Sequence, residues 1–444
     1  MKAASRTFWG LLVLVSALWF LADSLLPDPF TYFSFRTVFV QYSGAIAIAV
    51  MSVAMMLAVR SRWLESRLNG LDKMYRLHKW LGISALVAAT LHWWMAKGTK
   101  WMVGWGWLEK PQRGPRPEET LGYIEGLFRS SRGFAESVGE WAFYAAALLM
   151  VLALIKKFPY HLFKKTHTLL AIGYLALVFH SLVLIKFDYW TQPIGWLLAL
   201  LMLGGSLSGI WILARQVGKN RRVGGEIAAV VHYPELRTVE TSIRVKAGWP
   251  GHKAGQFAFV TTNDREGPHP FTIASAWDES SQCLTIISKA LGDHTSRMLD
   301  YLKPGLEVEV EGPYGCFDFE DDRPHQIWIG AGIGITPFVA RLQELAQLPG
   351  RKTVDLFHST ADIDENALAK LKADAEAAGV TLNLIVSGVD GRLTVERICQ
   401  QVPDWQVSSV WFCGPVAFAD KLKQDFRSKG FDTSHFHQEL FQMR

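Results

Sequence analysis

The stretch HKWLGISALVAATLH, residues 78 to 92, has the apolar character of a membrane span and carries a histidine at each end. Polar groups inside lipid are costly, and in membrane helices they usually mark a functional site. A span needs about 20 apolar residues, and the candidates are residues 8–27, 37–59, 78–96, 139–155, 166–186 and 193–213. Residues 1–222 are therefore predicted to form a six-helix transmembrane domain.

The basic residues predict how these spans are oriented. With six spans both termini lie on one side of the membrane, and a cytoplasmic location for them places most Lys and Arg residues of the short loops inside. Residues 97–138 run against this rule, because they would form an outer loop and yet hold seven basic residues. The prediction is a multi-pass protein of the inner (plasma) membrane, in contact with lipid, with cytoplasmic N- and C-termini.

A second pair of histidines, His167 and His180, lies on the fifth span. Spans three and five run in the same direction, so His78 shares its depth with His167, and His92 shares its depth with His180. At 1.5 Å per residue, the two histidines of one helix are about 20 Å apart, within a hydrocarbon core about 30 Å thick. Imidazole is an axial ligand of haem iron, so the pattern predicts two b-type haems, one near each membrane face.

Any one of these histidines, taken alone, could instead be a structural polar residue whose hydrogen bonds are satisfied where two helices meet. Four histidines paired at matched depths favour ligation. The 14 residues from His78 to His92 return to within roughly 40° of the same helix face. The 13 residues from His167 to His180 leave them roughly 140° out of phase, so the fifth span needs a local distortion; Gly173 lies between them and would permit one.

From residue 223 onward the composition is that of a soluble protein. Residues 223–322 show short alternating strands at 241–245, 283–288 and 306–312, which predict a small antiparallel barrel. Residues 323–444 alternate helices with strands at 327–330, 354–358, 382–386 and 410–414, as a parallel α/β nucleotide-binding domain does. The predicted fold class is multi-domain, with a six-helix transmembrane haem bundle, an antiparallel β-barrel FAD domain and an α/β Rossmann-like NAD(P) domain.

Three segments of the soluble half have the pattern of phosphate or nucleotide sites. KALGDHTSRML (289–299) places glycine and hydroxyl residues before a helix, as a phosphate site or as an ordinary helix cap at Asp293 or Thr295. GAGIGITPF (330–338) is a glycine-rich turn that opens a helix and lets the backbone approach a pyrophosphate. CGP (413–415) ends the last strand at the carboxyl edge of the sheet, where ligands bind in open α/β folds.

Other classes of site find little support. No Lys/Arg-rich segment interleaved with aromatic residues suggests nucleic acid. The four cysteines all lie in the soluble half, without metal-site spacing and without indication of a disulfide framework.

Taken together, these segments resemble the superfamily of NADPH oxidases and membrane ferric reductases, and more closely its bacterial branch of predicted ferric reductases. The resemblance extends over nearly the whole chain. It rests on the histidine spacings and, in this order, on HPFT (269–272), LGDHT (291–295), EGPYG (311–315), GIGITP (332–337) and CGP (413–415).

The resemblance implies which residues contact the cofactors. For FAD it implies His269, Pro270, Phe271, Thr272, Lys289, Gly292, Thr295 and Phe441. Thr272 would lie near the reactive edge of the flavin, and Phe441 would cover it until nicotinamide displaces it. For NAD(P)H it implies Gly330, Gly332, Gly334, Thr336, Pro337, Cys413, Gly414 and Pro415. Cys413 would border the nicotinamide.

Two departures from the family pattern leave questions open. NADPH-selective members usually place an arginine after the second nucleotide strand, where this chain reads FHSTADID (357–364), so NADH use or mixed use is credible. Superoxide-producing oxidases place a further histidine one turn after the outer ligand of span three, where this chain has Ala96.

The expected function is electron transfer from cytosolic NAD(P)H, through FAD and two b haems, to an outer acceptor that is a ferric chelate or dioxygen. No obligatory protein partner is predicted, and no side-chain acid, base or nucleophile is needed. Two alternatives stay open. One is an electron-supply module for a partner protein or quinone, and the other is a transporter or receptor with a regulatory nucleotide domain.

Overall fold

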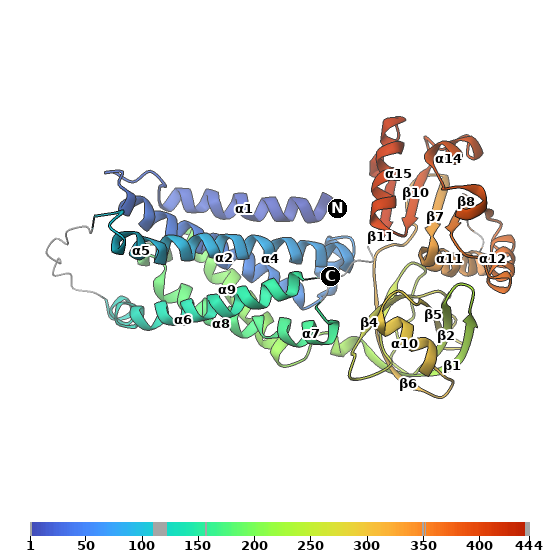
Figure 1. Ribbon diagram of the computed structural model, residues 1–444, viewed down its shortest axis with the longest axis horizontal. Helices are drawn as coiled ribbons and strands as arrows, with labels where there is room; N and C mark the ends of the chain where they lie inside the picture. The colour runs from blue at the N-terminus through green and yellow to red at the C-terminus, as the bar shows by residue number, and fades with distance from the viewer. Residues whose placement is uncertain (1, 110–121, 156–157, 349, 351, 440–444) are drawn as a thin grey trace. The chain divides into compact units, whose positions relative to one another are not determined.

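The computed structural model describes residues 2–109, 122–155, 158–348, 350 and 352–439 (Figure 1). The chain divides into two compact units near residue 217. The first unit is helical, and the second contains both β-sheets.

The first unit is built from helices. They are α1 (Lys2–Ala22), α2 (Tyr32–Ala58), α3 (Arg62–Arg67), α4 (Leu71–Trp93), the π-helical η1 (Trp94–Gly98), α5 (Thr99–Gly104), α6 (Tyr123–Leu154), α7 (Tyr160–Thr168), α8 (Leu170–Leu184), the 3-10 helix η2 (Phe187–Thr191) and α9 (Pro193–Leu213). Five of the described helical segments are long and apolar enough to cross a membrane: α1, α2, α6, Leu162–Leu184 and α9. This part of the chain is therefore embedded in a membrane.

Helix α4, the third predicted span, is not one of those five. It carries four charged residues and two histidines, which lower its hydropathy. The count of six spans stays a prediction.

The expectation of an outer loop throughout 97–138 is wrong at both of its ends. Helical structure continues through η1 and α5 to Gly104, and α6 begins at Tyr123, sixteen residues before the predicted span at 139. Backbone hydrogen bonding continues past the apolar stretch because no proline interrupts residues 123–138, and the hydropathy pattern reports only the apolar stretch. Residues 110–121 of the expected loop lie outside the described residues.

The fifth predicted span is interrupted between its two histidines. Helix α7 ends at Thr168 and α8 begins at Leu170. Around Leu169 the backbone makes short i→i−3 bonds, from Leu169 N to Thr166 O (3.1 Å) and from Ile172 N to Leu169 O (3.0 Å). A 3-10 turn rotates the chain further per residue than an α-helix does. This break therefore reduces the angle about the helix axis that separates His167 from His180. The distortion lies four residues before Gly173.

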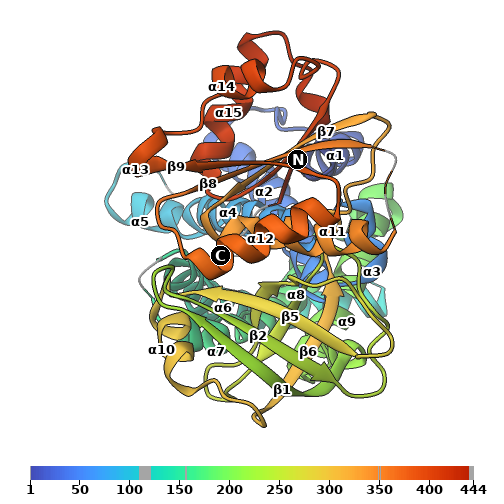
Figure 2. The same ribbon diagram turned by 90° about the vertical axis from the view of Figure 1, so that its right-hand side faces the viewer.

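The second unit begins with a six-stranded antiparallel sheet. Its strands are β1 (Arg222–Tyr233), β2 (Thr238–Val245), β3 (Phe257–Thr261), β4 (His269–Thr272), β5 (Cys283–Lys289) and β6 (Glu307–Tyr314), in the order β4-β3-β6-β1-β2-β5. A bridge between Ile273 and Ile286 links the two edges, which makes the sheet a barrel. Figure 2 shows β6, β1, β2 and β5 side by side. Helix α10 (Asp293–Tyr301) follows β5.

The remainder of the second unit is a parallel sheet with helices. Strands β7 (His325–Ala331), β8 (Thr353–Thr360), β9 (Thr381–Val386), β10 (Ser409–Cys413) and β11 (Phe436–Glu439) lie in the order β11-β10-β7-β8-β9. The helices are η3 (Lys219–Arg221), which precedes the barrel, and η4 (Gly332–Ile335), α11 (Thr336–Gln347), α12 (Glu365–Ala377), α13 (Ser387–Asp390), α14 (Val395–Gln401), α15 (Val416–Ser428) and η5 (Thr433–His435). Buried side chains of this sheet, such as Trp328 and Trp411, form one core cluster with Phe317 and Phe319, which follow β6.

Candidate functional site

The four histidines of the membrane unit meet in two pairs. The ring centres of His78 and His167 are 5.9 Å apart, and those of His92 and His180 are 6.2 Å apart. A metal–imidazole bond of about 2 Å on each side of an ion separates two ring centres by about 6 Å. Each pair is therefore spaced to hold one metal ion between its rings.

Backbone carbonyls fix the tautomer of three of these rings. Nδ1 of His78 lies 2.9 Å from Ala54 O, Nδ1 of His92 lies 3.0 Å from Val40 O, and Nδ1 of His180 lies 2.8 Å from Ala135 O. A carbonyl oxygen only accepts hydrogen bonds, so each Nδ1 carries the proton and each Nε2 keeps its lone pair. Such a partner on the far nitrogen is the usual support of a histidine that binds a metal.

His167 differs from the other three. Its Nδ1 is buried and has no hydrogen-bond partner among the described residues. The ring packs instead on Phe163, with ring centres 5.0 Å apart and planes 26° apart.

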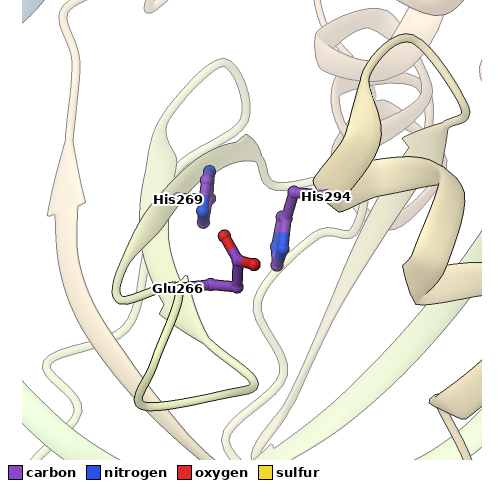
Figure 3. A group of neighbouring side chains, drawn as sticks. All are labelled: Glu266, His269 and His294. Carbon is purple, nitrogen blue, oxygen red and sulfur yellow. The ribbon is translucent and has the colours of Figure 1, made fainter. Parts of the chain in front are cut away.

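The two segments expected to bind FAD lie against each other. His269 opens β4, and His294 is the second residue of α10. Their rings are stacked, with centres 3.8 Å apart and planes 12° apart, beside Glu266 (Figure 3). The remaining residues of HPFT lie in β4, where Pro270 pairs with Phe259 and Thr272 pairs with Phe257.

The turn before α10 is closed by Thr295. The Thr295 hydroxyl accepts hydrogen bonds from Leu291 N (3.1 Å) and Gly292 N (3.2 Å). The Thr295 side chain therefore orders this turn from inside α10, whereas the N-cap residue is Gly292 and not Asp293 or Thr295 as the cap alternative expected. Lys289, the last residue of β5, has its Nζ 3.6 Å from Asp362. Phe441 lies outside the described residues.

The glycine-rich turn follows β7 as the sequence suggested. Gly330 lies in β7, Gly332 and Gly334 in η4, and Thr336 and Pro337 open α11. A Cβ atom on Gly334 would collide with the carbonyl oxygen of Cys413, so only glycine allows this close approach. The turn and the CGP segment are thus brought together at the carboxyl edge of the sheet.

Cys413 is fully buried at the end of β10, where it pairs with Gly330. Burial, followed by the nearby carboxylate of Glu439, raises the pKa of the Cys413 thiol well above its usual value. The Cys413 Sγ lies 3.7 Å from Glu439 Oε2. Gly414 and Pro415 follow directly and lead into α15. Cys413 is therefore a neutral thiol.

One cleft of the second unit joins residues of both predicted nucleotide sites. This cleft is partly open to solvent. Its walls include Lys289 from the barrel, Gly332 from the glycine turn, and His358 and Asp362 from the end of β8 and the segment after it.

Sequence reasoning missed several supporting residues. Gly139 leaves room for the ring of His180, and Arg36 donates to Met95 O (2.9 Å) and Ala96 O (3.0 Å) in the π-helical turn that follows His92. Segments of π-helix occur often at functional sites. His358 Nδ1 donates to Gly330 O (3.1 Å), and burial lowers the pKa of His358. None of these residues belongs to a sequence motif, so they can be recognised only from their positions in the folded structure.

A protein family model matches the membrane part of the chain. Residues 43–178 match the family model described as "Ferric reductase like transmembrane component". The matched range contains His78, His92 and His167.

Several curated proteins are also similar in sequence. The NADPH oxidoreductase of Mycobacterium tuberculosis (strain H37Rv) is 30% identical over 243 residues, which are 52% of this chain and 62% of the relative. Flavohemoprotein B of Dictyostelium discoideum is 30% identical over 173 residues, 35% of this chain and 41% of the relative. Ferric reduction oxidase 4 of Arabidopsis thaliana is 34% identical over 92 residues, 20% of this chain and 13% of the relative. The chain spans 56–62% of the length of the first four relatives.

Among solved structures, a flavohemoglobin from Malassezia yamatoensis is similar with a TM-score of 0.47 at 17% identity, over 92% of this chain and 97% of that one. The chain is thus similar to a ferric-reductase-like transmembrane family over residues 43–178, and to oxidoreductases that include an NADPH oxidoreductase and a ferric reduction oxidase.

Proposed function

We propose that the chain transfers electrons across the membrane, from cytosolic NAD(P)H through FAD and two bis-histidine b haems to an acceptor on the outer face. The observation that carries this proposal is the pairing of the four membrane histidines, with ring centres 5.9 Å and 6.2 Å apart. Both distances fit an ion held between two imidazoles.

The donor set fits haem iron. Three of the rings have a protonated Nδ1 held by a backbone carbonyl, so their Nε2 lone pairs are available as axial ligands. His78 and His167 would hold the inner haem, and His92 and His180 the outer one. Each haem would be held by two histidines of this chain and would supply one-electron transfer.

The residues of the second unit would divide between two cofactors. We assign residues 1–222 to the transmembrane haem domain, 223–322 to the FAD domain and 323–444 to the NAD(P)H domain. His269 to Thr272 and Lys289, Gly292 and Thr295 would bind FAD, with Phe441 over the flavin. The glycine turn (Gly330, Gly332, Gly334, Thr336 and Pro337) would bind the NAD(P)H pyrophosphate, and Cys413, Gly414 and Pro415 would border the nicotinamide. Bound FAD splits the hydride pair from NAD(P)H into single electrons, which the haems accept one at a time.

The acceptor outside is a ferric chelate or dioxygen. The relatives named ferric reduction oxidase support the former. Both acceptors can be tested in vesicles that hold the purified protein with its second unit facing outward. NADH or NADPH is added outside, and a membrane-impermeant ferric chelate is trapped inside.

The proposal predicts reduction of the trapped iron. A parallel assay measures superoxide with a trapped probe and superoxide dismutase as control. Reduction of iron added outside, with none of the trapped iron reduced, would contradict transmembrane transfer. In the same preparation the proposed topology predicts an N-terminus that faces outward, on the side of the second unit, and is accessible to added protease.

A second candidate function is an electron-supply module for a partner protein. Two relatives are named as reductase subunits, one of a stachydrine N-demethylase and one of a glycine betaine monooxygenase. Steady turnover of the purified chain with NAD(P)H and a ferric chelate, without any partner, would exclude a need for one.

A further inference from the structure

The loop between β3 and β4 brings a carboxylate next to the stacked imidazoles of His269 and His294. One ligand atom from each of Glu266, His269 and His294 lies within 4.8 Å of the others. Figure 3 shows the Glu266 carboxylate at the edge of both rings. All three side chains are partly buried.

Backbone hydrogen bonds of a turn, a strand and a helix position the three residues. Glu266 N (3.2 Å) and Gly267 N (3.0 Å) both donate to Asn263 O, and Gly267 has a φ of +79°, which favours glycine. His269 is fixed in β4 by its pairing with Val260 in β3. His294 lies in the first turn of α10. The cluster therefore joins three separate segments of the barrel part.

One ligand atom of the cluster, on His294, is not used by hydrogen bonding among the described residues. Nε2 of His294 is buried and has no hydrogen-bond partner among the described residues. Glu266 Oε1 accepts from Arg297 Nη2 at 2.7 Å, and the Arg297 side chain is 60% exposed. An exposed ion pair is weak, so a cation that binds Glu266 more directly can displace Arg297.

We propose that Glu266, His269 and His294 bind one divalent transition-metal ion, for which zinc is the best match. Two imidazoles and one carboxylate are a donor set of known zinc sites, whereas magnesium and calcium prefer oxygen ligands. Zinc bonds of about 2.0–2.2 Å place ligand atoms of a tetrahedral site about 3.4 Å apart. Zinc binding would bring the ligand atoms closer together and tilt one ring out of the stack, because the lone pairs of parallel rings do not converge.

Three protein ligands leave the fourth position of a tetrahedral zinc ion open. Water fills this position, or an oxygen of the FAD pyrophosphate that we assign to residues 289–295. A pyrophosphate oxygen as the fourth ligand rests on the proposed function, but the metal site itself does not.

Zinc binding to the full-length protein with its cofactors tests the proposal. After chelator treatment, equilibrium dialysis against zinc sulfate and metal analysis give zinc per chain. We expect one more zinc bound by the wild type than by Glu266→Gln or His294→Ala, or an affinity at least ten times lower in each variant. Arg297→Ala removes the competing cation and is expected to strengthen zinc binding severalfold. His325→Asn is the matched control, since it removes a histidine that contacts a single carboxylate, Asp355 (2.7 Å), and zinc binding should not change.

Haem absorbance per chain and the circular dichroism spectrum show whether each variant is folded. Equal zinc content in the wild type, Glu266→Gln and His294→Ala overturns the site. Repeating the dialysis on flavin-depleted protein separates the two sources of the fourth ligand, because a phosphate ligand predicts weaker zinc binding without FAD. A protein that binds zinc at these residues but no flavin would sustain the metal site and contradict the proposed function.

Discussion

The ring of His180 lies directly against Gly139 of α6, so closely that a Cβ atom on Gly139 would collide with it. The same ring donates to Ala135 O, one turn earlier on α6. Helix α6 therefore both supports His180 and leaves it space.

Substitution Gly139→Ala is expected to displace His180 and to weaken the outer haem site. Haem per chain, measured by the pyridine haemochrome method, should fall from about two toward one. Gly133→Ala is the matched control, because a Cβ atom at Gly133, on the same helix, has no neighbour within 4 Å. Equal haem loss in both variants would mean that glycine matters for the helix rather than for the histidine.

Gly334 makes the corresponding close approach in the nucleotide-binding part. A methyl group in Gly334→Ala would push the glycine turn away from the Cys413 carbonyl. We expect the rate of flavin reduction by NAD(P)H to fall at least tenfold in stopped-flow measurements, with haem content unchanged. Gly388→Ala, where a Cβ atom meets nothing within 4 Å, is the control. A normal rate of flavin reduction in Gly334→Ala would mean that the glycine turn does not bind the nucleotide.

The Asp321 carboxylate links strands β7 and β10, because it also accepts a hydrogen bond from Gln326 Nε2 (2.9 Å) in β7. It accepts hydrogen bonds from Lys352 Nζ (2.7 Å), Ser409 Oγ (2.6 Å) and Trp411 Nε1 (2.9 Å). Burial alone would raise the pKa of Asp321, but these hydrogen bonds outweigh it and lower the pKa to about 2. The folded protein thus favours the ionised form of Asp321, and this charge stabilises the fold.

This contribution has a defined pH dependence. Because the folded pKa lies below the unfolded value of 3.8, the stabilisation is present above about pH 4 and is lost as the pH falls toward 2. We therefore expect Asp321→Asn to lower the thermal midpoint of flavin release at pH 7, with a difference from wild type that shrinks below pH 4. Asp322→Asn, at an exposed neighbouring carboxylate, should have no such effect. A difference that is constant with pH would contradict the role of the charge.

The sequence predicted seven strands of the second unit, because short alternating runs are local signals, but it did not predict β1, β3, β4 or β11. The seven predicted strands coincide with β2, β5, β6, β7, β8, β9 and β10 to within a few residues at either end. The four histidines were found from spacing alone, since residues at equal depth on parallel helices meet in space.

Contacts between segments distant in the chain could not be predicted. The helix break at Leu169, the support of His180 by α6 and the stacking of His269 on His294 depend on tertiary packing. Helix ends were also misjudged, because hydropathy marks the apolar part of a helix and α6 begins at Tyr123, well before that part.

Anaerobic rapid mixing of the purified protein with NADH and with NADPH tests the central proposal most directly. The expected result is about two haems per flavin, with flavin reduction followed by reduction of both haems at their absorption bands. In His92→Leu, one haem should be lost while the flavin and the remaining haem are still reduced. Haem that dithionite reduces but neither nucleotide does, or a purified protein without haem, would contradict electron transfer from NAD(P)H through the paired histidines.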